Sequence, residues 1–147
     1  MITSKQIELV QQSWQIIVSR DMQTTGRIFY NCLFELAPEV KPMFRRASVN
    51  EQSAKFLSMI NYFIMNLNNP QDAVGAISIL AKQHVTYGVQ EEQYTLIGRA
   101  LLWTLQTTFT DKWNNELKQA WIIAYTMLAE AMMKAAKQHE QANERVY

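Results

Sequence analysis

The chain has 147 residues, of which 48% are hydrophobic and 18% are charged, and its formal net charge is +1. This length suits one domain with a buried core, spanning residues 1–147, and the composition argues against disorder. The near-neutral charge gives no reason to expect a nucleic acid or an anionic membrane as a partner. No stretch reaches the roughly 18 apolar residues of a membrane span, and residues 1–11 are too polar for a signal peptide.

Cysteine, glycine and proline are scarce in this sequence. The single cysteine, Cys32, cannot form an internal disulfide, which suits a cytoplasmic protein and excludes a cysteine-rich zinc site. Four glycines and three prolines are too few for the many turns of an all-β domain. The composition therefore predicts an all-α domain, with Cys32 as a buried small hydrophobic residue.

The first half of the chain shows helical periodicity that is interrupted by prolines. Thr3 and Gln6 have the spacing of a capping box, which predicts a helix start there. A second helix is expected over about 25–36, because Pro38 disfavours a helical conformation in the residue before it. A short helical turn over 38–44 follows. The apolar stripe of the first helix is formed by Ile7, Val10, Trp14 and Ile17.

Further helices are predicted over about 51–67, from Asp72 to His84, over 91–109 and over 114–137. Asn68-Asn69-Pro70 and Gly88 mark the breaks between them. The sequence thus predicts about seven or eight helices in all. One face of the first of these helices carries Gln52, Phe56, Met59, Ile60 and Phe63. One stripe of the last helix carries Leu117, Trp121, Tyr125, Leu128 and Met132.

The two histidines alone say little about function. A lone histidine on an apolar helix face, such as His84, is more often a hydrogen-bonded core residue than a metal ligand. His139 lies in a polar stretch, so no three-ligand zinc site is apparent. A haem differs, because the porphyrin supplies four nitrogens and the protein need add only one imidazole.

Several motifs, in order and over nearly the whole chain, resemble bacterial single-domain globins and the globin part of flavohaemoglobins. The stretch around His84, Ala-Lys-Gln-His-Val-Thr-Tyr-Gly-Val over 81–89, resembles their proximal segment. The other matching segments are 29–34, 38–44, 92–98, 101–105, and Ala120-Trp121 with Ala124-Tyr125. The resemblance implies a globin fold around one haem b (iron protoporphyrin IX).

On the distal side, the resemblance assigns Tyr30 and Gln52 as hydrogen-bond donors to an iron-bound gas. A solvated Gln52 and a core Tyr30 bonded to a main-chain carbonyl are the alternatives. Phe44 corresponds to the phenylalanine that packs on the porphyrin. Phe56 replaces the usual distal leucine, which reshapes the pocket. Lys55 is expected to pair with a haem propionate or, alternatively, to bind ferric iron.

On the proximal side, the resemblance makes His84 the iron ligand and Tyr94 the residue that helps orient its imidazole. Flavohaemoglobins complete this network with a glutamate on the last helix, which makes the imidazole more basic. That position here is Ala136, and the nearest acid on the helix is Glu130. We therefore expect an incomplete relay. The haem is expected to be lined further by Phe29, Leu80, Tyr87, Val89, Ile97 and Met127, and Arg45 and Arg46 are alternative propionate partners.

These assignments predict a ferrous iron that is five-coordinate and open to dioxygen, nitric oxide and carbon monoxide. Two donors on bound oxygen, each contributing about 1.5–3 kcal/mol, would make oxygen release slow. We expect reversible high-affinity oxygen binding and conversion of nitric oxide to nitrate. Because the sequence has no room for a flavin domain, that enzymatic activity is expected to need a separate reductase. The protein is expected to be a monomer or a weak dimer.

Two other functions stay open on the sequence. A haem-based gas sensor would need a partner protein, because no output domain is present. The other is a haem-free helical domain, either structural or bilin-binding. Bilin attachment would need an available cysteine, and Cys32 is expected to be buried.

Overall fold

The computed structural model describes residues 2–44, 49–69, 78 and 91–146; within these ranges the side chains of 43, 44, 49–53, 55, 56 and 138–146 are not described. The described residues form five α-helices and two 3₁₀ helices and contain no strand. The all-α prediction is confirmed, although five α-helices are fewer than the helices expected. The helix predicted to end at His84 lies outside the described residues except for residue 78.

Helix α1 (Ser4–Val18) begins with the predicted capping box. The Thr3 hydroxyl accepts from the Gln6 amide at 3.1 Å, and the Gln6 side chain accepts from the Thr3 amide at 2.9 Å. Helix α2 (Met22–Leu36) starts earlier than predicted, because the Asp21 carboxylate caps it by accepting from Gln23 N–H. The α2 helix ends before Pro38, where the 3₁₀ helix η1 (Pro38–Phe44) begins.

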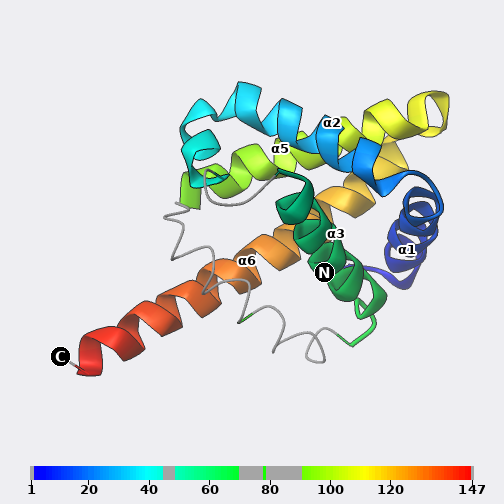
Figure 1. Ribbon diagram of the computed structural model, residues 1–147. Helices are drawn as coiled ribbons and strands as arrows, with labels where there is room; N and C mark the ends of the chain where they lie inside the picture. Colours follow the sequence, from blue (N-terminus) through cyan, green and yellow to red (C-terminus); the bar gives the residue numbers. More distant parts are fainter. Residues whose placement is uncertain (1, 45–48, 70–77, 79–90, 147) are drawn as a thin grey trace.

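Helix α3 (Val49–Met65) and helix α5 (Glu91–Phe109) follow near the predicted positions. The short 3₁₀ helix η3 (Thr110–Lys112) leads to helix α6 (Asn115–Val146). The start of α6 agrees with the prediction, but the helix continues past residue 137, and its far end projects from the body (Figure 1).

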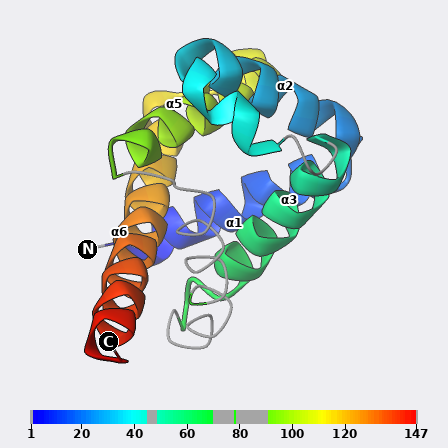
Figure 2. The same cartoon turned by 60° about the vertical axis from the view of Figure 1, so that its left-hand side comes forward.

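Helices α2 and α5 lie side by side and cover one end of the molecule, while α1, α3 and α6 pack below them (Figures 1 and 2). Two buried indoles hold the lower helices together. The Trp14 and Trp121 rings lie 6.0 Å apart. Trp14 donates to the Asn61 side chain at 2.8 Å, and Trp121 donates to the Ser13 hydroxyl at 2.9 Å. These bonds fix α1 against both α3 and α6.

None of the helices in the described part of the chain is long and apolar enough to cross a bilayer. The apolar stripes predicted for α1 and α6 face the core, with Val10, Trp14, Trp121 and Met132 nearly inaccessible to solvent. On α3, Ile60 and Phe63 are buried as predicted, and Met59 is half-buried. Burial of these faces is the main source of the fold's stability.

Candidate functional site

Tyr30 occupies the buried face of α2. Only 4% of its surface is exposed, and its ring packs edge-on against Phe29 at 5.0 Å and tilted against Phe34 at 5.9 Å. Burial raises the pKa of the Tyr30 hydroxyl well above its ordinary value of 10.0. Because the phenol therefore stays protonated throughout the physiological pH range, Tyr30 retains a proton that it can donate in a hydrogen bond.

The other expected distal residues belong to η1 and α3. Phe44 ends η1, while Gln52, Lys55 and Phe56 lie in the first half of α3; their side chains are outside the described part. Positions 52, 56 and 60 are four residues apart, so they lie in one row along the helix. Ile60, the described member of this row, is buried. The role of Gln52 as a distal donor stays a prediction.

The expected iron ligand and its neighbours fall in one segment of the chain. The described residues do not include His84, Leu80, Tyr87 or Val89. Arg45 and Arg46, the alternative propionate partners, also lie outside the described residues. Their predicted roles stay predictions.

Tyr94 lies in the first turns of α5 and is 7% exposed. Its main-chain carbonyl oxygen accepts a 2.6 Å hydrogen bond from the hydroxyl of Tyr125 on α6. Burial raises the pKa of the Tyr94 hydroxyl, and burial together with the nearby Tyr94 raises that of Tyr125. Both phenols are therefore neutral at physiological pH. Ile97 and Met127, the other expected lining residues of these helices, are half-buried and pack against the core.

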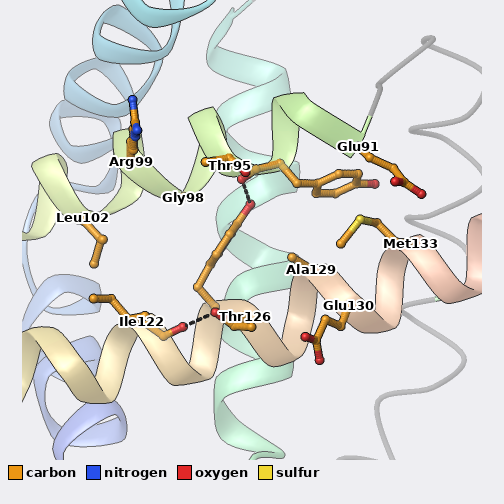
Figure 3. A pocket seen from close by; sticks show the side chains of 12 residues that line it. Glu91, Thr95, Gly98, Arg99, Leu102, Ile122, Thr126, Ala129, Glu130 and Met133 are labelled. Carbon is orange, nitrogen blue, oxygen red and sulfur yellow. Dashed lines mark hydrogen bonds between the residues drawn. The ribbon is translucent and has the colours of Figure 1, made fainter.

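Gly98 lies where the Tyr125 ring crosses α5. A Cβ atom placed on Gly98 would lie 2.7 Å from Cε2 of Tyr125, closer than real side chains approach. Beside this crossing, α5 and α6 line an open, mostly apolar pocket of about 410 Å³ (Figure 3). The pocket is lined by Glu91, Tyr94, Thr95, Gly98, Arg99, Leu102, Ile122, Tyr125, Thr126, Ala129, Glu130 and Met133.

Sequence reasoning assigned no role to Gly98 and only a core position to Tyr125. An isolated glycine inside a helical pattern was the available signal, because it often marks a close approach of another element. Position 136, which matches the glutamate expected from flavohaemoglobins, is a half-buried alanine, and the exposed Glu130 lines the pocket.

Cys32 is half-buried, so the prediction of a buried cysteine was wrong. It lies on α2 just outside the fully buried row of Phe29, Tyr30 and Leu33. Partial burial and the nearby Glu35 carboxylate raise the thiol pKa, which disfavours the reactive thiolate. No group of three or more histidine, cysteine or acidic residues that could hold a metal occurs in the residues that the structure describes.

Comparisons with known proteins agree with this arrangement of helices. The family model named globin matches residues 27–132. An anaerobic nitrite reductase from Physcomitrium patens is 32% identical, over 91% of this chain and 81% of the relative. A flavohemoprotein from Rhodopirellula baltica is 30% identical over 97% of this chain, which spans only 36% of that longer relative.

Among solved structures, a bacterial globin from Campylobacter jejuni is similar, with a TM-score of 0.84 and 26% sequence identity. The match covers 95% of this chain and 99% of the other. An engineered carbene transferase from Rhodothermus marinus has a TM-score of 0.87 at 22% identity, over 98% of this chain and 99% of the other, which supports the fold alone.

Proposed function

Because this chain belongs to the globin family, we propose that it binds one haem b, with the His84 imidazole as the single protein ligand to iron. The porphyrin brings four nitrogens, so one neutral imidazole completes the attachment. The described residues fit such a group. Ile97 and Met127 are apolar and half-buried, so they retain surface that a flat apolar ring can cover.

The observation that carries the function is the buried hydroxyl of Tyr30. A bound haem would supply the iron for a gas ligand, and oxygen held there would carry partial negative charge. A neutral phenol in a dry pocket can donate a hydrogen bond to that charge, and such a bond contributes about 1.5–3 kcal/mol, or roughly 10- to 150-fold in affinity. Gln52 would add a second donor. This favours slow release of oxygen, which suits scavenging better than delivery.

We therefore assign the chain to reversible oxygen binding and to the reaction of bound oxygen with nitric oxide, which gives nitrate. A haem held by His84 would supply the ferrous iron for this reaction, in which dioxygen and nitric oxide would combine to nitrate at the cost of one electron from the iron. A separate reductase must then return one electron to the iron in each cycle. The similarity to 36% of a longer flavohemoprotein supports the proposal that a separate protein reduces the iron.

The proximal side favours oxygen binding over peroxidase chemistry. A carboxylate that accepts a hydrogen bond from the ligating imidazole makes that imidazole more basic and promotes cleavage of the oxygen–oxygen bond. Ala136 has no such group, and the exposed Glu130 lies beside the α5–α6 pocket. Weak electron donation from the proximal side is the consequence.

Nitrite reduction is a second candidate, favoured by the 32% identity to an anaerobic nitrite reductase. A haem held by His84 would supply the one electron that this reaction needs, and nitrite with two protons would give nitric oxide and water. The neutral Tyr30 hydroxyl can donate a hydrogen bond to a nitrite oxygen as it can to oxygen.

Stopped-flow mixing distinguishes the two candidates. The oxygenated protein, mixed with an equal amount of nitric oxide, should give nitrate and ferric haem within milliseconds. Tyr30→Phe should lower the yield of nitrate, while Tyr62→Phe, which alters an exposed tyrosine on α3, should not. Slow conversion in air, combined with rapid production of nitric oxide from nitrite by the deoxygenated ferrous protein, would favour the second candidate.

A further inference from the structure

The contact between Tyr125 and α5 is made to the main chain of that helix. In an α-helix the carbonyl of Tyr94 accepts from the N–H four residues later, which belongs to Gly98. The Tyr125 hydroxyl is a second donor to the same oxygen, at 2.6 Å, and it can use the oxygen's other lone pair. Two residues that Tyr125 touches, Tyr94 and Gly98, are thus the two ends of one helical hydrogen bond.

The absence of a side chain at Gly98 makes this contact possible. A Cβ atom there would lie 2.7 Å from Cε2, 3.1 Å from Cδ2 and 3.4 Å from Cζ of Tyr125, along one edge of the ring. The ring is tightly held by its surroundings, because its hydroxyl is already bonded to α5 at a short distance. An alanine at position 98 would therefore displace the ring and lengthen the bond to Tyr94.

Among the described residues, an ion pair also links the first turn of α5 to α6. Lys137 and Glu91 form an ion pair at 3.3 Å, but both side chains are more than half exposed. An exposed pair of this kind contributes little to stability because water and salt screen it. The Tyr125 ring, in contrast, is half-buried, and its hydroxyl bonds to the main chain of α5.

We propose that Tyr125 is a positioning residue that holds the first turns of α5 against α6. The lack of a side chain at Gly98 is required for the Tyr125 ring to lie at this position. This inference rests on the proposed function, because its consequence is for the haem. Tyr94, whose carbonyl is held, follows closely after His84 in the chain and is the expected neighbour of the ligating imidazole. With no acid at position 136, a hydrogen bond between two neutral groups fixes this side of the site.

The test uses the full chain with haem added and compares Tyr125→Phe with the wild type. Removal of the hydroxyl alone should raise the hydrogen-exchange rate of the Gly98 amide by roughly 5- to 10-fold, since one hydrogen bond is lost. In the ferrous protein, the iron–histidine stretching band in the resonance Raman spectrum should move to lower frequency, because Tyr94 then supports the imidazole less firmly.

Two further variants make the result specific. Gly98→Ala should reproduce both effects, because it displaces the same ring. Thr126→Val is the matched control: it removes the neighbouring hydroxyl, which donates to Ile122 O at 2.7 Å within α6 (Figure 3), and should change neither reading.

Unchanged Gly98 exchange in Tyr125→Phe would overturn the proposed role of the hydrogen bond. Faster exchange with an unmoved iron–histidine band would overturn the positioning role and leave Tyr125 a structural residue. A wild-type protein that takes up no haem would instead overturn the proposed function, and exchange at Gly98 in that haem-free chain would still decide whether Tyr125 holds α5.

Discussion

The indole N–H of Trp121 donates to the hydroxyl of Ser13 at 2.9 Å, and this buried bond joins the first helix to the last. Ser13 in turn donates to main-chain carbonyls of its own helix, at 2.8 Å from Leu9 O and 3.0 Å from Val10 O. Its hydroxyl therefore satisfies a buried indole that has no access to water.

Ser13→Ala should lower the free energy of unfolding by about 1–3 kcal/mol, because it leaves the Trp121 N–H buried without its acceptor. Urea titration followed by circular dichroism measures the change. Ser19→Ala removes an exposed hydroxyl that bonds to Ile16 O at 2.7 Å and should cost much less. Equal losses in the two variants would contradict the importance of the buried bond.

Gly98 and Tyr125 should be strongly coupled in a double-mutant cycle. Gly98→Ala alone should destabilise the protein by about 1–3 kcal/mol, because the new methyl group overlaps the Tyr125 ring. In a Tyr125→Ala background the overlap is gone, and the same change should stabilise α5 by about 0.5–1 kcal/mol through its helix propensity. Additive effects, measured by urea titration, would show that the two residues do not interact.

Asp21 gives the fold a dependence on acid pH. Hydrogen bonds from Thr24 and from the Gln23 amide lower the pKa of the Asp21 carboxyl below its ordinary 3.8. Its contribution to stability is therefore complete above the unfolded-state pKa and is lost as the pH falls through the lower folded-state value. Asp21→Asn keeps an oxygen to cap α2 but removes the charge.

The measurement for Asp21 is the urea midpoint from pH 7 down to about pH 2.5. The wild type should lose more stability than Asp21→Asn as the pH falls below about 4. Parallel pH profiles would mean that the Asp21 charge adds nothing to the cap.

Tyr30 should control the release of oxygen. Tyr30→Phe should raise the oxygen dissociation rate by roughly 10- to 150-fold, the loss expected for one strong hydrogen bond. Because burial raises the Tyr30 pKa, the wild-type rate should be the same at about pH 7 and pH 9.5. Flash photolysis and stopped-flow measure both rates, and an unchanged rate in Tyr30→Phe would mean that the hydroxyl does not meet the gas.

Much of the fold followed from local signals in the sequence. The Thr3 and Gln6 capping box, the stop before Pro38 and the apolar stripes of α1 and α6 all have the predicted form, because each depends on neighbouring residues. The early start of α2 was missed because the Asp21 side chain caps the helix at Met22, whereas the predicted helix began only at about residue 25. The extent of α6 was also underestimated, because its polar last turns lack an apolar stripe.

The candidate site was less predictable, because its contacts join distant helices. Tyr30 and Tyr94 are buried, and the haem-site roles that the resemblance implies for them stay predictions. No pattern in one sequence, however, pairs Tyr125 with the carbonyl of Tyr94 across two helices, and the meaning of Gly98 appears only once the ring of Tyr125 is in place. Partial exposure of Cys32 likewise depends on how α2 packs against the other helices.

The central claim is that His84 holds a haem with an open sixth position. Absorption spectra of the haem-loaded protein in ferric, ferrous and carbon monoxide forms test it most directly, with His84→Ala as the comparison. We expect an intense Soret band that shifts on reduction and again with carbon monoxide, a five-coordinate ferrous spectrum, and loss of most of the haem in His84→Ala. Absence of a Soret band after addition of haem, or identical spectra and haem content in His84→Ala, would contradict the claim.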